Sequence, residues 1–228
     1  MTIHLRPSSP IAPDVLVPGD PARAMALAQQ LLVKPIMHNL HRGLWGYSGE
    51  TADGLHLSVQ STGMGAPSAA IVVEELARLG ARRAIRVGTC GGLDNGLELG
   101  QLVRADSAIG EDGISRGLGA DDGPVQGDAE LTSRLKAAGA GEPVRVVTTD
   151  FFYEHGPAPR ERWAAAGAQV VDMETAALFA LGPRVGVATA ALLIVSDVFP
   201  GGERLRIGDD ALAQSVEAMA RAAAGALA

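Results

Sequence analysis

The sequence predicts an α/β fold, with one domain built on a mixed central β-sheet flanked by helices. Short runs rich in β-branched residues alternate with alanine-rich segments whose apolar residues recur at helical spacing. The chain has 228 residues, of which 47% are hydrophobic, enough to bury one sizeable core. We therefore expect residues 1–228 to form a single domain.

Each element follows from its local pattern. The expected strands cover residues 14–17, 55–61, 83–87, 144–149, 168–173 and 187–197. The expected helices cover residues 21–32, 66–79, 128–138, 174–180 and 209–227. The segments WGYSGE and LHLSVQS, separated by TADG, predict a hairpin. The glycine- and acid-rich stretch 110–128 predicts a mobile surface loop.

Composition excludes several classes of partner. A net charge of -7 disfavours a surface for nucleic acid or anionic membrane, because phosphate-rich polymers would be repelled. Cys90 is the single cysteine, which rules out an intramolecular disulfide and fits a reducing compartment. No stretch reaches the roughly 18 apolar residues that a membrane span needs. We expect a cytoplasmic protein with no nucleic-acid or membrane partner.

The segment VPGDPAR (17–23) places an arginine at the start of an expected helix. A cation is mildly unfavourable there, so Arg23 calls for an anion to share the site. The alternative is a turn capped by Asp20, with Arg23 at the surface.

The segment RVGTCGG (86–92) places Arg86 in an apolar strand, where an arginine needs a partner. The glycines that follow let backbone amides approach a ligand, and Thr89 adds a hydroxyl. Arg23, Arg86 and Thr89 together would bind a dianion of phosphate size. A structural bulge with an ion pair is the alternative.

Two further segments carry acids where strands end. In VVDMETAAL (170–178), Asp172 and Glu174 either supply charge at a helix N-terminus or accept hydrogen bonds from a vicinal diol such as that of ribose. In ALLIVSD (191–197), an apolar run ends in Ser196 and Asp197. A partly desolvated acid in that position suits general-acid catalysis, although Asp197 could also be a cap or turn residue.

Together these segments resemble the nucleoside phosphorylase superfamily, most closely its bacterial hexameric purine nucleoside phosphorylases, with uridine phosphorylases next. The resemblance runs from His4 to about Asp197 and is carried by VPGDPARA, STGMGAPSAAIVVEEL, RVGTCGGL, TDFFY, VVDMETAAL and IVSD. It implies phosphorolysis of the N-glycosidic bond of purine ribo- or deoxyribonucleosides, with inorganic phosphate as co-substrate and with no cofactor or metal.

The resemblance also implies residue roles. Phosphate would be bound by Gly19, Arg23, Arg86 and Thr89, and Arg42 and His4 would reach across from a neighbouring subunit. That crossing implies a homo-oligomer, expected to be a hexamer built from dimers. The nucleoside would be contacted by Met64, Phe152, Asp172, Met173, Glu174 and Ser196, with Glu174 on the ribose hydroxyls and Phe152 on the base.

Asp197 would protonate purine N7, assisted by Arg206 or, alternatively, by Arg204. Position 172 departs from the family's glutamate and is one methylene shorter, which weakens the implied contact of Asp172 with ribose.

Three rival functions are compatible with parts of this pattern. A uridine phosphorylase would carry a uracil-binding glutamine and arginine within residues 153–162, which read YEHGPAPRER here. A nucleosidase would lack the phosphate arginines, and a non-catalytic nucleoside sensor would not need Glu174 and Asp197 together. The purine phosphorylase interpretation is favoured.

Overall fold

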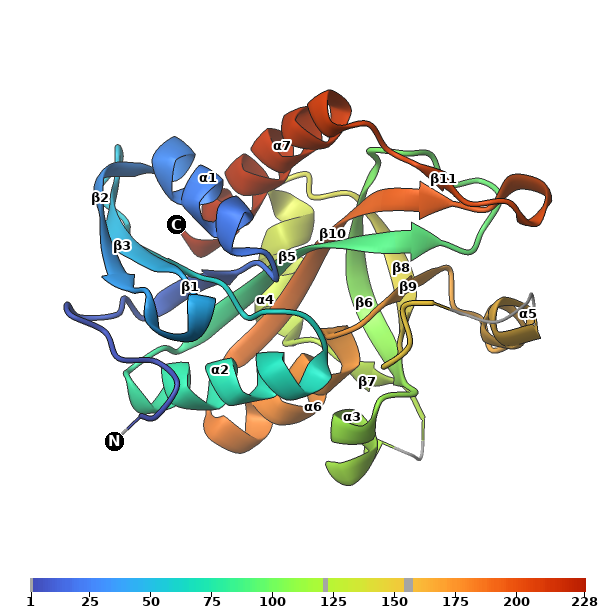
Figure 1. Ribbon diagram of the computed structural model, residues 1–228, viewed down its shortest axis with the longest axis horizontal. Helices are drawn as coiled ribbons and strands as arrows, with labels where there is room; N and C mark the ends of the chain where they lie inside the picture. Colours follow the sequence, from blue (N-terminus) through green and yellow to red (C-terminus); the bar gives the residue numbers. More distant parts are fainter. Residues whose placement is uncertain (1, 121–122, 154–157) are drawn as a thin grey trace.

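A computed structural model describes residues 2–120, 123–153 and 158–228, and this part of the chain contains an eleven-stranded mixed sheet (Figure 1). The strand order is β11-β10-β6-β8-β9-β5-β1-β4-β3-β2, with β7 paired to β6. The strands are β1 (Asp14–Val17), β2 (Leu32–Asn39), β3 (Gly46–Thr51), β4 (His56–Gln60), β5 (Arg83–Gly92), β6 (Leu102–Gly110), β7 (Val125–Gln126), β8 (Glu142–Thr148), β9 (Val170–Asp172), β10 (Ala188–Val198) and β11 (Leu205–Arg206).

Part of the sheet closes on itself. Strand β10 pairs in parallel with β5 and antiparallel with β6, while β8 and β9 connect β6 back to β5. The carboxyl ends of β1, β5 and β10 consequently point the same way, because β5 runs parallel to both β1 and β10. Loops that follow these ends converge, as they do in other sheets with parallel strands.

Helices cover both sides of the sheet. Figure 1 shows α1 and α7 on one side of the central strands and α2 and α6 on the other. The helices are α1 (Pro21–Leu31), α2 (Ala66–Arg78), α3 (Gly113–Gly117), α4 (Ala129–Ala137), α5 (Ala158–Ala165), α6 (Thr175–Val185) and α7 (Asp209–Leu227). None of the helices in the described ranges is both long and apolar enough to span a membrane.

The core follows from the alternation of side chains along the strands. Leu16 packs with apolar residues of α1, α4 and α7, whereas its neighbours Val15 and Val17 pack with α2 and α6. This period of two sends successive side chains of a buried strand into opposite layers. Strand β1 is therefore apolar after its first residue, Asp14.

The α/β class and the mixed sheet are confirmed, and the predicted hairpin is formed by β3 and β4. The prediction of a loop over 110–128 is wrong in part, because α3 and β7 lie within it. Helix α3 begins there because the Asp112 side chain accepts a hydrogen bond from the Ser115 N–H at 2.8 Å.

Strands β2, β6 and β11 and helix α5 were also absent from the predictions. Strand β6 carries Arg104 and Asp106, which interrupt its apolar pattern and pair with each other at 3.0 Å. Strand β2 lies at the edge of the sheet and exposes much of its length, so it lacks a clear apolar period. Helix α5 has a single buried residue, Trp163. In addition, α6 continues to Val185, beyond the predicted end at residue 180.

Candidate active site

A cavity of about 510 Å³ opens at the carboxyl ends of β1, β5 and β10. Twelve of the fourteen expected site residues line it: Gly19, Arg23, Met64, Arg86, Thr89, Phe152, Asp172, Met173, Glu174, Ser196, Asp197 and Arg206. Segments far apart in the sequence thus converge on one concavity, as the strand-end motifs predict. His4 and Arg42 do not line it.

At one end of the cavity, arginines gather near the start of α1. Asp20 caps this helix by accepting the Ala22 N–H at 2.9 Å, and Pro21 occupies its first turn. Burial lowers the pKa of Arg23; Asp20 opposes this effect, and the nearby charges of Arg86 and Arg206 add to it. The proximity of several cations and a helix N-terminus makes this end of the cavity suited to an anion.

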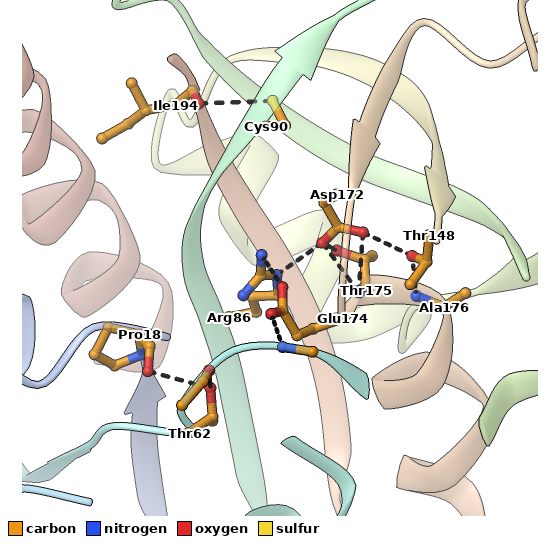
Figure 2. Close-up of polar contacts among 12 residues, drawn as sticks. Pro18, Thr62, Arg86, Cys90, Thr148, Asp172, Glu174, Thr175, Ala176 and Ile194 are labelled. Atoms are coloured by element: carbon orange, nitrogen blue, oxygen red, sulfur yellow. Dashed lines mark hydrogen bonds and ion pairs between the residues drawn. The ribbon is translucent and has the colours of Figure 1, made fainter. Parts of the chain in front are cut away.

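Arg86 lies between two carboxylates, as Figure 2 shows. Its Nε donates to Asp172 Oδ2 at 3.0 Å, and its Nη2 lies 2.7 Å from Glu174 Oε2. Burial acts to lower the pKa of Arg86, but Glu174 and Asp172 outweigh it, so that the pKa is raised. The side chain folds back along β5 over Gly88, where an added Cβ would lie 2.7 Å from the Arg86 Cζ. Glycine at 88 therefore makes room for the guanidinium.

Asp172 positions Arg86. Its Oδ1 accepts from the Thr148 hydroxyl at 2.7 Å, and its Oδ2 accepts from the Thr175 N–H at 3.0 Å and hydroxyl at 2.5 Å as well as from Arg86. The Asp172 side chain is fully buried. These donors hold both carboxylate oxygens beside the guanidinium, and the contact of Asp172 with ribose stays a prediction.

Glu174 is the N-cap residue of α6 and lines the cavity. Its Oε1 accepts the Gly65 N–H at 2.6 Å, which ties the carboxylate to the start of α2. Burial raises the pKa of Glu174, while Arg86 counteracts the shift. Met64 and Met173 border the same part of the cavity, and Met64 is 85% exposed.

Asp197 also lines the cavity. It is buried near the end of β10, where an irregularity in the pairing with β5 falls between Val195 and Asp197. Such bulges redirect side chains next to active sites. The Ser196 hydroxyl donates to Asp197 Oδ2 at 2.6 Å, and Arg206 Nη1 donates to both carboxylate oxygens at 3.2 and 3.3 Å.

Arg204 also reaches Asp197, with its Nε 3.2 Å from Oδ1. The alternatives left open by the sequence are therefore both in contact with the acid. Arg204 immediately precedes β11 (Leu205–Arg206), and residues two apart in an extended segment share a face, so the spacing of the two arginines around Leu205 is a sequence signal for that arrangement. The Arg204 guanidinium lies 4.5 Å from the ring centroid of Phe152, the residue expected to face the base.

His4 and Arg42 lie elsewhere on the molecule. His4 is held by Glu75 of α2, whose Oε1 is 2.9 Å from the His4 Nδ1. Arg42 is exposed in a short turn with a positive φ of 58°. The family resemblance implies that both residues serve the site of a neighbouring subunit, and this stays a prediction. A uridine phosphorylase would carry its uracil-binding residues within residues 153–162. Residues 154–157 of this segment lie outside the described part of the chain.

Comparison with known proteins adds independent findings. Residues 13–228 match the family model described as the phosphorylase superfamily. The chain is 39% identical over 205 residues to a DeoD-type purine nucleoside phosphorylase of Clostridium perfringens, covering 86% of this chain and 87% of the relative. It is 39% identical over 211 residues to the DeoD-type enzyme of Caldanaerobacter subterraneus, covering 89% and 90%.

Solved structures are similar as well. A purine nucleoside phosphorylase from Toxoplasma gondii in complex with immucillin-H has a TM-score of 0.87 and 28% identity, over 96% of this chain and 91% of that one. A uridine phosphorylase from Vibrio fischeri has a TM-score of 0.84 and 26% identity, over 95% and 92%. The fold is thus shared with structures named as a purine nucleoside phosphorylase and as a uridine phosphorylase.

Proposed function

Because this chain belongs to the phosphorylase superfamily, we propose that it is a pentosyltransferase that cleaves purine nucleosides with phosphate. The observation that carries the proposal is the convergence of Arg23, Arg86, Glu174 and Asp197 on one cavity. The same cavity thus holds two arginines, a buried carboxylate at the N-cap of α6 and a buried acid near the end of β10. These groups suit phosphate, pentose and base respectively.

At the phosphate end, Arg23, Arg86 and Thr89 bind the dianion, with Gly19 beside the start of α1. Arg86 is already fixed by Asp172 and Glu174, so little reorganisation is needed when phosphate arrives. A phosphate oxygen attacks C1′ as the bond from C1′ to N9 breaks. The positive charge that the dianion requires comes from the protein's arginines, so the proposed reaction draws on no cofactor.

At the base end, the electron pair of the broken bond moves into the purine, and N7 takes a proton from Asp197. Burial of Asp197 keeps water from competing for that contact. Ser196 and Arg206 hold the carboxyl group in place by hydrogen bonds to its oxygens. The products are the neutral purine and the pentose 1-phosphate.

We include self-association in the proposal, with His4 and Arg42 completing the site of a partner subunit in a hexamer built from dimers. Partial desolvation and the charges of Arg6, Arg42 and His4 lower the pKa of His41, so these side chains form a cationic cluster. No carboxylate in the described residues pairs with Arg42. The same region of the molecule carries exposed apolar side chains on the edge strand β2 and just beyond it: Val33, Ile36, Met37 and Leu40. Exposed apolar side chains on the edge strand β2, next to the cationic cluster that contains Arg42, suit an interface with a second subunit whose site binds an anion.

The deciding experiment incubates purified protein with inosine, adenosine and uridine, each with and without phosphate. We expect purine and pentose 1-phosphate only when phosphate is present. Release of base at the same rate without phosphate would identify a nucleosidase instead. Cleavage of uridine alone would move the chain to the pyrimidine branch.

The variant Asp197→Asn tests the assignment of the acid. It cannot supply the proton, so kcat for purine nucleosides should fall by about 100-fold or more. Phosphate affinity, measured by calorimetry, should stay within about twofold because the ion pairs of Asp197 run to Arg204 and Arg206, and those of Arg86 to Asp172 and Glu174. Unchanged kcat would remove Asp197 from this role.

A further inference from the structure

Helix α6 begins beside the cavity, and its first N–H groups are not satisfied by its own N-cap residue. An N-cap side chain normally accepts a hydrogen bond from one of the first N–H groups of the helix. Glu174 occupies the N-cap position of α6, but its side chain accepts no such bond. Instead, the Thr175 N–H donates to Asp172 Oδ2 at 3.0 Å. The Ala176 N–H donates to the Thr148 hydroxyl oxygen at 2.9 Å. The Glu174 carboxylate is therefore not used in capping and can serve the cavity that it lines.

Two threonine hydroxyls connect this helix end to Asp172. The Thr148 hydroxyl, whose oxygen accepts the Ala176 N–H, donates its proton to Asp172 Oδ1 at 2.7 Å. Thr148 and Asp172 are paired in register on the parallel strands β8 and β9, which places their side chains beside each other. The Thr175 hydroxyl donates to the other carboxylate oxygen, Oδ2, at 2.5 Å. Figure 2 shows Asp172 between Arg86 and these two threonines.

Asp172 and Glu174 in turn set the direction of the Arg86 guanidinium. Arg86 donates its Nε to Asp172 Oδ2 at 3.0 Å, and its Nη2 lies 2.7 Å from Glu174 Oε2. A planar guanidinium held at two of its nitrogens cannot turn without breaking one of these contacts. The position of Arg86 thus depends on two carboxylates, and the hydroxyls of Thr148 and Thr175 hold one of them.

Neither threonine is placed to touch a ligand, because both are fully buried and neither lines the cavity. We propose that Thr148 and Thr175 are positioning residues for the phosphate site. Their hydroxyls fix the carboxylate of Asp172 and, through it, the guanidinium of Arg86 that binds phosphate. The inference rests on the proposed function and extends its phosphate site to two residues behind the cavity wall.

The test compares Thr148→Val with Thr148→Ser. Valine keeps the shape of the side chain but removes the hydroxyl, so the Ala176 N–H loses its acceptor and Asp172 Oδ1 keeps only the Thr175 N–H, at 3.3 Å. We expect the Michaelis constant for phosphate to rise about tenfold in Thr148→Val, while that for the nucleoside stays within about threefold. Thr148→Ser retains the hydroxyl and should stay within about twofold of the unchanged protein for both constants. An unchanged constant for phosphate in Thr148→Val, or an equal rise in the two variants, would overturn the inference.

Thr189→Val is the matched control. Thr189 is 2% exposed, and its hydroxyl donates to the Leu178 carbonyl of α6 at 3.2 Å, so it contacts the same helix but binds its backbone instead of Asp172. We expect its urea midpoint to fall as in Thr148→Val and its Michaelis constant for phosphate to stay unchanged. A rise of equal size in Thr189→Val would show that loosening α6 is sufficient and would refute the positioning role. If Thr148→Val does not fold, Thr175→Val and Thr175→Ser make the same comparison at the other oxygen of Asp172.

Calorimetry with inorganic phosphate separates this inference from the proposed function, because binding needs no turnover. Weaker binding by Thr148→Val than by Thr148→Ser supports the inference even if no nucleoside is cleaved. Phosphorolysis by the unchanged protein, with equal phosphate affinity in the two variants, would leave the proposed function standing and refute the positioning role. Absence of phosphate binding by the unchanged protein would overturn both.

Discussion

Arg86 Nη2 lies 2.7 Å from Glu174 Oε2, and both side chains are at most 7% exposed. Both residues of this ion pair line the cavity, and Asp172 accepts a hydrogen bond from the Nε of the same guanidinium. One buried cation therefore balances two buried carboxylates. Desolvation of such groups is costly unless each is paired, so the three residues depend on one another.

Replacing Arg86 with methionine should consequently damage both stability and function. Two carboxylates would be left buried without their cation, and we expect the free energy of unfolding to fall by about 3 kcal/mol or more. The Michaelis constant for phosphate should rise at least about tenfold, since a charged hydrogen bond is lost. Urea unfolding and phosphate titration of activity measure the two effects.

Arg83 offers a matched control on the same strand. It pairs with Asp14 at 2.6 Å, but its side chain is 30% exposed. Solvent screens such a pair, so Arg83→Met should lower the free energy of unfolding by only about 1 kcal/mol and leave the phosphate dependence unchanged. Equal destabilisation by the two variants would contradict the importance assigned to the buried triad.

Gly88 leads to a second prediction. A Cβ at this position would lie 2.7 Å from Arg86 Cζ, so Gly88→Ala must push the guanidinium out of its place. We expect a rise of about tenfold in the Michaelis constant for phosphate, because small displacements of a positioned charge are costly. Steady-state kinetics at saturating nucleoside would measure it. Gly117→Ala is the control, because an added Cβ there meets no atom within 4 Å; an effect of the same size in both variants would show that crowding of Arg86 is not the cause.

The sequence predicts the central strands well because burial on both faces makes them uniformly apolar. Strand β10, predicted over 187–197, forms over Ala188–Val198. Strand β6 was missed because Arg104 and Asp106 interrupt its apolar pattern. The two side chains form an ion pair with each other, and a pattern of hydrophobicity does not reveal such a pair. Edge strand β2 was missed because most of its side chains are exposed, so its sequence shows no alternation of apolar and polar residues.

The sequence predicts those site residues that come directly after the carboxyl ends of expected strands. The acids and arginines of four separate motifs meet in one cavity, as parallel strands require. The role of Asp172 was not predictable, because its partner Thr148 belongs to β8 and carries no motif of its own. The contact of Arg204 with Phe152 joins residues 52 positions apart through a ring face, and only the folded chain brings them together.

Glu75 provides a third prediction, about the N-terminal segment. Burial acts to raise the pKa of this carboxyl, but the N–H groups of Leu5, Ile3 and His4 and the His4 ring together lower it to about 2. The folded pKa thus lies below the usual value near 4.5, so this contribution to stability is present above about pH 4.5 and is lost as the pH falls toward 2.

The variant Glu75→Gln should release residues 3–5 from α2, because an amide has only one acceptor oxygen for these donors. We expect faster hydrogen exchange in this segment at neutral pH, together with lower activity if His4 serves a partner's site. Glu74→Gln is the matched control, since Glu74 is the next residue on α2 and pairs with the exposed Arg78 at 2.9 Å. Equal exchange rates in the two variants would show that Glu75 does not anchor the segment.

His38 gives a fourth prediction, for the dependence of stability on pH. The ring is 2% exposed, with Nε2 3.1 Å from Gln60 Oε1 and Nδ1 2.9 Å from Ser48 Oγ. Gln60 also donates its amide to the Leu44 carbonyl at 3.0 Å, which keeps its oxygen turned toward the ring. Burial lowers the pKa of His38 below 6.5, partly opposed by the hydrogen bond to Gln60.

The unfolded chain therefore binds a proton at His38 more readily than the folded chain. Above about pH 6.5 neither state is protonated there and the effect vanishes; below it, stability falls by up to about 1.4 kcal/mol per pH unit until the folded ring also titrates. Urea unfolding at pH 7.5 and 5.5 should show a smaller decrease in His38→Gln than in the unchanged protein. His56→Gln should retain the full decrease, because the His56 side chain is 72% exposed; the same slope in all three proteins would place the acid sensitivity elsewhere.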